Sequence, residues 1–318
     1  MIDLNGKKVL LVRNDNIGDL ICTTPAIEAL KKHYSQAEVD IVVNSYNRMV
    51  LDGFAFIDRI YSYTKPKHRK SIYRKIAAGA GKTAMLWQIR KKRYDAVVIF
   101  RGGYSRSAEL FAKIAGAPIR IGVKNPKGED TITHPVNPQT NRHEVEFCFD
   151  CLAHFGIDYD GEKTYFPIEL QTSQTFASYH DAILFHISSR VAENRYDMEK
   201  FRQLFLHLKD RRILVSAEPQ DCRKALWLQE QTHATFIPTS SLKELAALVH
   251  RVERFVTLDG GALHIGPAVG TPTIALIGKT DISRWHPWGY RDLTLSSPTD
   301  RAADIPIDAI IEKIEEID

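Results

Sequence analysis

The segment from Phe255 to Gly289 constrains the fold most strongly, because it reads as a strand, a glycine turn, a short helix and a second strand within 35 residues. Its opening apolar run suits a buried parallel strand, and Asp259 follows at the carboxyl end, where open α/β sheets bind ligands. Gly260 and Gly261 then allow the backbone to turn sharply and to approach a ligand closely. The stretch from Ala262 to Val269 is predicted as a short helix whose free N–H groups face the same place, which suits a phosphate group.

A glycine turn alone would also fit an ordinary crossover between two parallel strands, since such a unit needs glycine at its corners. The residues around the turn favour a binding site instead. His264 follows the glycines, and Trp285, His286 and Trp288 follow the second strand. Polar and aromatic groups gather here, where packing alone would favour aliphatic side chains.

Two motifs carry a resemblance to a known family. The first is D-G-G-A-L-H-x(5)-G-T-P-T-x-A-L-x-G-x-T-D, which starts at Asp259 and is followed by W-x-P-W-G. The second, R-x-D-x-I-G-D-x-x-x-x-T-P-A-I, starts at Arg13. Together they resemble the ADP-heptose:lipopolysaccharide heptosyltransferases, which form glycosyltransferase family 9. The resemblance covers most of the chain.

The N-terminal motif spans a predicted buried strand, Lys8–Arg13, the polar loop after it and the start of a helix. In the family the aspartate of the G-D pair is taken as the general base, and this role maps onto Asp19. The alternative is that Asp19 caps the helix, a position that aspartate favours. With the second motif also present, we interpret Asp19 as the base.

The C-terminal half is expected to bind the nucleotide sugar. The family resemblance implies a lysine that contacts the donor phosphates, but Asn194 stands at that position, and Arg195 offers the nearby cation. Gly260 likewise stands where the family has a threonine, so one hydroxyl is missing from the phosphate site. The residues expected to bind the donor are Ser188, Ser189, Arg195, Asp259, Gly260, Gly261, Ala262 and His264.

A basic segment, Lys65 to Arg93, contains 11 Lys or Arg residues and no acidic residue, interleaved with apolar side chains. Such a segment binds anionic surfaces, although a solvated helical face has the same composition. The loop after the next predicted strand adds polar groups, and Lys124 to Thr140 is predicted as a further loop. The residues expected to bind the acceptor are Asn16, Arg101, Tyr104, Arg106, Lys67, Arg69 and Lys70.

The length of 318 residues favours two domains, which we place at 1–160 and 161–318, with the last helix free to pack back on the first. No apolar run is long enough to span a membrane, and the N-terminus enters a strand at once without a signal peptide. Four cysteines fit a reducing compartment. We therefore expect a cytoplasmic protein that attaches peripherally to the cytoplasmic face of the inner membrane.

The predicted fold is α/β of the GT-B type, with two doubly wound Rossmann-like domains facing a central cleft. The first domain is expected to bind a phosphorylated glycolipid acceptor and the second ADP-heptose. The resemblance implies an inverting transfer of heptose to the lipopolysaccharide inner core without a metal or cofactor, and no role for nucleic acid. Two alternatives remain: a family member that uses another nucleotide sugar, such as a hexosamine donor, and a nucleotide-sugar-binding protein without catalysis.

Overall fold

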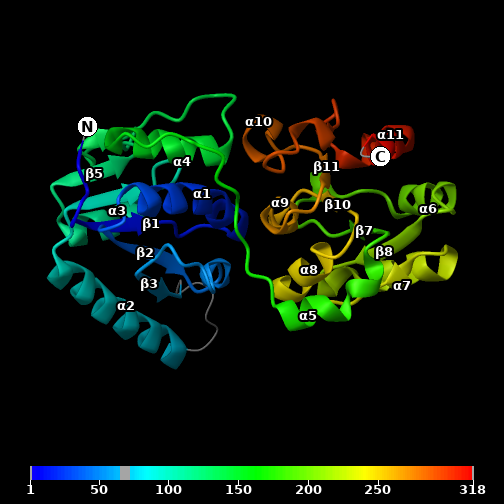
Figure 1. Cartoon of the computed structure of the whole chain (residues 1–318), viewed down its shortest axis with the longest axis horizontal. Coiled ribbons are helices and arrows are strands. Elements are labelled where there is room, and N and C mark those ends of the chain that lie inside the picture. Colours follow the sequence, from blue (N-terminus) through cyan, green and yellow to red (C-terminus); the bar gives the residue numbers. More distant parts are fainter. Residues whose placement is uncertain (1, 65–71, 317–318) are drawn as a thin grey trace. The chain divides into compact units, whose positions relative to one another are not determined.

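The computed structural model describes residues 2–64 and 72–316, and from 72 to 80 it describes the backbone alone. The chain divides into two compact units, Met1–Lys163 and Thr164–Asp318. In Figure 1 each unit is a sheet with helices packed on it.

The first unit contains a parallel sheet with the strand order β3-β2-β1-β4-β5-β6. Its strands are β1 (Lys8–Val12), β2 (Glu38–Asn44), β3 (Arg59–Tyr63), β4 (Ala96–Ile99), β5 (Ile119–Gly122) and β6 (His134–Pro135). Its α-helices are α1 (Ile17–His33), α2 (Ile72–Lys92), α3 (Arg106–Ala115) and α4 (Glu144–Leu152). The strand β6 corrects the expectation of an uninterrupted loop from Lys124 to Thr140, because its backbone pairs with the end of β5.

The order of the strands reverses between β1 and β4, so the loops that follow these two strands lie at a topological switch point. One face of the sheet packs Leu10 and Val12 against Met85 and Ile89 of α2 and against Phe111 of α3. The helices α1 and α4 pack on each other, and Figure 1 shows α2 and α4 on opposite sides of the sheet. This packing brings the beginning of α4 close to the beginning of α1.

Helix α1 continues through Pro25, which has no backbone N–H to donate to the carbonyl of Ile21. The hydroxyl of Thr24 donates to that carbonyl at 2.7 Å instead. The neighbouring hydroxyl of Thr23 donates to the carbonyl of Asp19 at 2.8 Å. These side-chain bonds occupy the carbonyls of the predicted catalytic aspartate and of Ile21, two residues after it.

The second unit repeats the same topology, with the order β12-β11-β10-β7-β8-β9 and all described pairs parallel. Its strands are β7 (Ala182–His186), β8 (Arg212–Ser216), β9 (Thr235–Phe236), β10 (Arg254–Leu258), β11 (Thr273–Ile277) and β12 (Thr294–Ser296). Its α-helices are α5 (Leu170–Thr175), α6 (Met198–His207), α7 (Cys222–Gln231), α8 (Leu242–Val249), α9 (Ile265–Val269), α10 (Ile282–Trp285) and α11 (Ile307–Glu315). Here the switch point lies between β7 and β10.

Aromatic packing against β7 forms part of the second core, where Phe185 contacts Phe201 and Phe205 of α6. The last helix, α11, buries Ile310 and Ile314 in this same core. The predicted helix from Ala262 to Val269 is two shorter elements, a 3₁₀ turn over Gly261–His264 and then α9. The helix dipole that points at the proposed phosphate position is therefore smaller than that of the single continuous helix predicted from the sequence.

None of the helices within the described ranges combines the length and the apolar run that crossing a bilayer requires.

Candidate active site

The loop after β1 carries the predicted base. Asp19 is the third residue of α1, and its Oδ2 accepts the backbone N–H of Asn16 at 3.3 Å, as in a capping box. Its Oδ1 accepts from Nη2 of Arg13 at 2.9 Å. The side chain remains 14% exposed. Asp19 therefore takes part in the cap and still presents a carboxylate to solvent, so the cap and the base are compatible roles.

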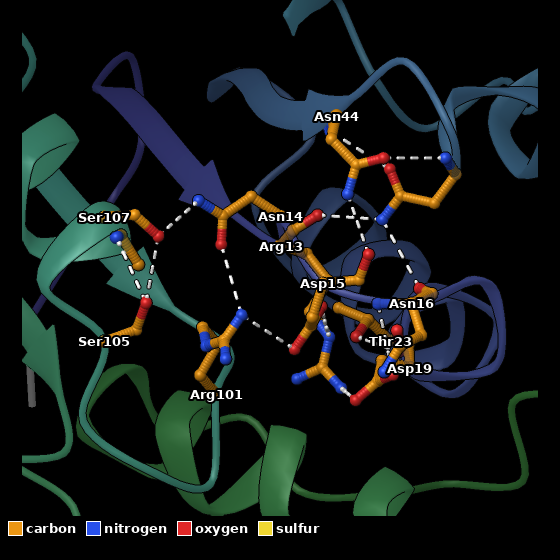
Figure 2. A network of polar contacts seen from close by, with 12 residues as sticks. Arg13, Asn14, Asp15, Asn16, Asp19, Thr23, Asn44, Arg101, Ser105 and Ser107 are labelled. Atoms are coloured by element: carbon orange, nitrogen blue, oxygen red, sulfur yellow. Dashed lines mark hydrogen bonds and ion pairs between the residues drawn. The ribbon is translucent and has the colours of Figure 1, made fainter. Parts of the chain in front are cut away.

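Arg13 is the centre of a buried cluster of charges. Its guanidinium has no exposed surface, and its Nε lies 3.1 Å from Oδ1 of Asp15, while its Nη2 lies 2.7 Å from Oε1 of Glu144. Arg101, from the loop after β4, reaches Oδ2 of Asp15 at 3.3 Å. Figure 2 shows Asp15 between the two arginines, with Asp19 on the far side of Arg13. The two loops at the switch point thus meet through Asp15.

The pKa of Asp15 in this cluster is shifted toward neutral pH. Burial raises the pKa of Asp15, the guanidinium groups of Arg13 and Arg101 oppose this shift, and the nearby carboxylate of Asp19 adds to it, so that the pKa is about 6. Asp15 was not among the predicted site residues, although the D of R-x-D-x-I-G-D pointed to it. Glu144 was missed as well, and no local signal in the sequence joins it to Arg13.

The predicted acceptor residues have different environments. Asn16 is exposed at the start of α1, and Arg106 is exposed as the first residue of α3. Arg101 joins the cluster and also donates to Oδ1 of Asn14 at 3.3 Å. The hydroxyl of Tyr104 donates to Glu109 of α3 at 2.6 Å. The other predicted acceptor residues, Lys67, Arg69 and Lys70, lie outside the described residues.

The second half of the basic segment is partly structural. Lys92 pairs with Glu38 and Asp40 at 2.5 Å. Lys82 lies over the rings of Tyr63 and Phe111, with the centroids 5.2 and 5.7 Å away. Lys92 thus joins the end of α2 to β2, and Lys82 lies over rings of β3 and α3.

In the second unit the loops after β7, β10 and β11 are joined by a network around Asp259. Its Oδ2 accepts from Nδ2 of Asn194 at 2.6 Å and from the hydroxyl of Thr280 at 2.6 Å. Its backbone carbonyl accepts the hydroxyl of Ser189 at 2.8 Å. The backbone carbonyl of Ser189 in turn accepts from Nε of Arg195 at 3.0 Å. The structure thus brings together three predicted donor residues: Ser189, Arg195 and Asp259.

Asn194 closes this network from inside the protein. It is fully buried, and its Oδ1 accepts the backbone N–H groups of Gly278 and Lys279, each at 3.0 Å. A buried amide with these partners orders the loops and does not reach a ligand. Within the described ranges the ammonium group of Lys279 meets no hydrogen-bond or ion-pair partner. Lys279 is therefore a cation at this edge of the sheet that the sequence analysis overlooked.

The remaining predicted donor residues lie in the loops next to this network. The hydroxyl of Ser188 accepts the backbone N–H of Glu218 at 2.8 Å, so Ser188 serves the loop after β8. Gly260 has an extended backbone with φ 161°, which corrects the expectation that its glycine conformation makes a sharp turn. Gly261 and Ala262 begin the 3₁₀ turn. The buried ring of His264 lies against the ring of Trp285, with the two ring centroids 6.0 Å apart. His264 therefore packs inside the unit as the last residue of this turn.

The strand order of both units defines the class of this protein. Two doubly wound Rossmann-like units with polar loops at the carboxyl ends of their central strands are the GT-B type of α/β fold, as the sequence predicted. Residues 83–314 match the sequence pattern of Glycosyltransferase family 9 (heptosyltransferase). The chain belongs to this family, and the resemblance found in its motifs is confirmed.

Individual proteins are similar along nearly the whole chain. Lipopolysaccharide heptosyltransferase 3 of Escherichia coli is 23% identical over 314 residues, which cover 89% of this chain and 90% of the relative. The solved glycosyl transferase family 9 protein from Veillonella parvula DSM 2008 has a TM-score of 0.84 at 20% identity, covering 99% of this chain and 98% of that one. The E. coli heptosyltransferase WaaC with ADP-2-deoxy-2-fluoro heptose has a TM-score of 0.77 at 21% identity, covering 97% and 99%.

Proposed function

We propose that this protein is an inverting, metal-independent glycosyltransferase that moves heptose from ADP-heptose to the inner core of lipopolysaccharide. Its membership of family 9 supports glycosyl transfer. The names of its relatives, a lipopolysaccharide heptosyltransferase and a heptosyltransferase solved with an ADP-heptose analogue, support the acceptor and the donor. The observation that carries the proposal is a partly exposed carboxylate, Asp19, at the switch point of one doubly wound unit, with a network of polar side chains at the switch point of the other.

In this proposal Asp19 accepts the proton of an acceptor hydroxyl as the oxygen attacks the anomeric carbon of the donor. The bond between that carbon and the diphosphate oxygen breaks, its electron pair stays on the diphosphate, and ADP leaves. Arg13 holds the carboxylate of Asp19 in place by the 2.9 Å contact described above. Attack opposite the leaving group inverts the configuration of the sugar carbon.

The diphosphate would lie against Gly260, Gly261 and the N–H groups of the short turn that follows them. Negative charge develops on the leaving group, and fixed cations stabilise it. Arg195 is exposed and donates from Nε to the carbonyl of Ser189, and Lys279 extends from the neighbouring loop. These two side chains would supply the positive charge that a metal ion supplies in other transferases. The basic segment around Lys67, Arg69 and Lys70 would attract the phosphorylated acceptor and the anionic membrane surface.

The proposal is tested with purified protein, ADP-heptose and inner-core glycolipid extracted from cells that lack this gene. Mass spectrometry should show the glycolipid gain the mass of one heptose, with release of one ADP, and EDTA should leave the rate unchanged. Gain of mass from a nucleotide hexosamine instead would support the alternative donor. ADP binding without turnover of either donor would identify a nucleotide-sugar-binding protein, and loss of activity in EDTA that magnesium restores would refute metal independence.

A further inference from the structure

One nitrogen of Arg13 is shared by two carboxylates from distant parts of the chain. Nη2 lies 2.7 Å from Oε1 of Glu144 and 2.9 Å from Oδ1 of Asp19. Both contacts are hydrogen bonds, whereas Nε and Nη1 of this buried guanidinium make none within the described residues. The two acids therefore share one NH2 group, whose two N–H bonds can serve one acid each, and both acids lie beside the same positive charge.

Glu144 differs from Asp19 in its access to solvent. Its side chain is 1% exposed, so it cannot touch a substrate, whereas Asp19 is 14% exposed. Glu144 is the first residue of α4, where the helix dipole stabilises a negative charge. It lies 131 positions from Arg13 and reaches the cluster because α4 packs on α1. A buried ion pair of this kind contributes little to stability compared with apolar packing, so its presence suggests another role.

We propose that Glu144 is a positioning residue for Asp19: Glu144 binds the shared nitrogen of Arg13 and draws part of the guanidinium charge away from the partly exposed carboxylate of Asp19. Asp19 then stays basic enough to accept a proton from the acceptor. This inference rests on the proposed function, in which Asp19 is the general base.

The charges around Asp19 explain the direction of the effect. The first unit contributes Arg13 from the end of β1, Asp15 from the next loop and Arg101 from the loop after β4. Helices α1 and α4 add the buried thiols of Cys22 and Cys148, whose pKa values burial raises, so both stay neutral. Three carboxylates thus face two guanidinium groups. If Glu144 becomes neutral, the positive charge of Arg13 is balanced only by Asp15 and Asp19. A carboxylate beside a less compensated cation has a lower pKa and is a weaker base.

The test replaces Glu144 by Gln, which keeps the shape and the hydrogen-bond acceptor but removes the charge. Protein labelled with ¹³C at the aspartate carboxyl carbon is titrated by NMR, and the Asp19 signal is assigned by its absence from Asp19→Asn. We expect the titration midpoint of Asp19 to fall by about one pH unit in Glu144→Gln, as removal of a close like charge implies. The acidic limb of the pH profile of kcat/KM should move down in parallel, with a lower plateau.

A matched control is Glu146→Gln, which makes the same charge change in the same helical turn. Glu146 accepts the backbone N–H of His143 at 2.7 Å, as part of the cap of α4. The Asp19 midpoint should stay within about 0.2 pH units of the parent in this control, because its charge lies outside the Arg13 cluster and is more exposed to solvent.

An Asp19 midpoint that is unchanged or higher in folded Glu144→Gln overturns the inference. If that variant does not fold, Glu144→Asp keeps the charge but shortens the side chain and withdraws it from Nη2, and the midpoint should again fall. An unchanged midpoint there overturns the inference equally. Failure of the proposed function is a separate observation, since it would appear as normal turnover by Asp19→Asn whatever the titration shows.

Discussion

The side-chain nitrogen of Asn194 lies 2.6 Å from Oδ2 of Asp259, which is 65 positions further along the chain. This bond joins the loops after β7 and β10, and the oxygen of the same amide binds the backbone after β11. The position where the family resemblance implies a phosphate-binding lysine is thus occupied by a buried connector. In the proposed function the cation for the donor phosphates therefore comes from a neighbouring residue.

Lys279→Gln should lower the affinity for ADP about tenfold, the usual size of one lost charge-assisted hydrogen bond. The fold should be unaffected, because Asn194 binds the backbone N–H at this position and not the side chain. Isothermal titration calorimetry with ADP measures the effect. Lys209→Gln is the control, since Lys209 is exposed and precedes β8. It therefore lies at the amino ends of the parallel strands, whereas Lys279 follows the carboxyl end of β11. Equal ADP affinity in both variants would leave Arg195 as the phosphate cation.

Gly260→Val should reduce ADP binding while the protein stays folded. The backbone of Gly260 is extended, and a Cβ there would meet nothing within 4 Å, so the branched side chain fits the protein but occupies the proposed phosphate site. By contrast, Gly278→Ala should lower the melting temperature, because its Cβ would lie 2.2 Å from the carbonyl of Glu193. Calorimetry and thermal unfolding distinguish the two results. A Gly260→Val protein that binds ADP normally would place the nucleotide elsewhere.

Asp19→Asn should reduce the rate of transfer by about 10²-fold or more, because a neutral amide cannot accept the proton. Asparagine retains the acceptor for the N–H of Asn16, so the cap and the affinity for ADP should change little. Asp197→Asn is the matched control, since Asp197 caps α6 by accepting the N–H groups of Glu199 and Lys200. Steady-state kinetics with both variants decides the role. Turnover near that of the parent in Asp19→Asn would eliminate Asp19 as the base.

Asp15→Asn should change how stability depends on pH. The pKa of Asp15 is about 6 in the folded protein, above that of an unfolded aspartate, so folding takes up a proton between about pH 4 and 6. The stability from this proton is present below that window and is lost as the pH rises through it. The amide of the variant does not titrate, so the unfolding free energy of the variant minus that of the parent should rise across the window, by at most about 1.4 kcal/mol per pH unit.

Urea unfolding of both proteins at several pH values between about 4 and 7 measures this difference. A difference that stays constant or falls across the window would mean that the ion pairs with Arg13 and Arg101 outweigh the burial of Asp15.

Replacing Lys67, Arg69, Lys70 and Arg74 by Gln should weaken binding to anionic vesicles and raise the apparent KM for the lipid acceptor. Each cation near an anionic surface contributes on the order of 1 kcal/mol, and salt screens the attraction. Affinity for ADP should not change. The control replaces four exposed lysines of the same unit, Lys113, Lys124, Lys127 and Lys163. Vesicle cosedimentation at low salt tests the pair, and equal binding by both variants would show that the basic segment has no special role.

Much of the fold follows from local sequence patterns. Apolar runs such as the one before Asp259 predicted the central strands, and the polar loop after the first strand predicted the start of α1 near Asp19. The two motifs identified the family and pointed to Asp19 and Asp259. These features depend on neighbours within a few positions, so the order of residues alone specifies them. The split of the predicted helix after Gly260 into a 3₁₀ turn and α9 shows where local reasoning is weakest, at the ends of short elements.

The tertiary structure alone decided which polar side chains meet. Arg13 reaches Glu144 because α4 packs on α1, and Asn194 reaches Gly278 because β7, β10 and β11 are neighbours in the second sheet. No pattern of spacing encodes such contacts, since they depend on how distant segments pack. The burial that raises the pKa of Asp15 is likewise a property of the assembled loops. The sequence therefore determined which strands, motifs and charged residues are present. The packing of helices on sheets determined which of the charged and polar side chains form hydrogen bonds with one another.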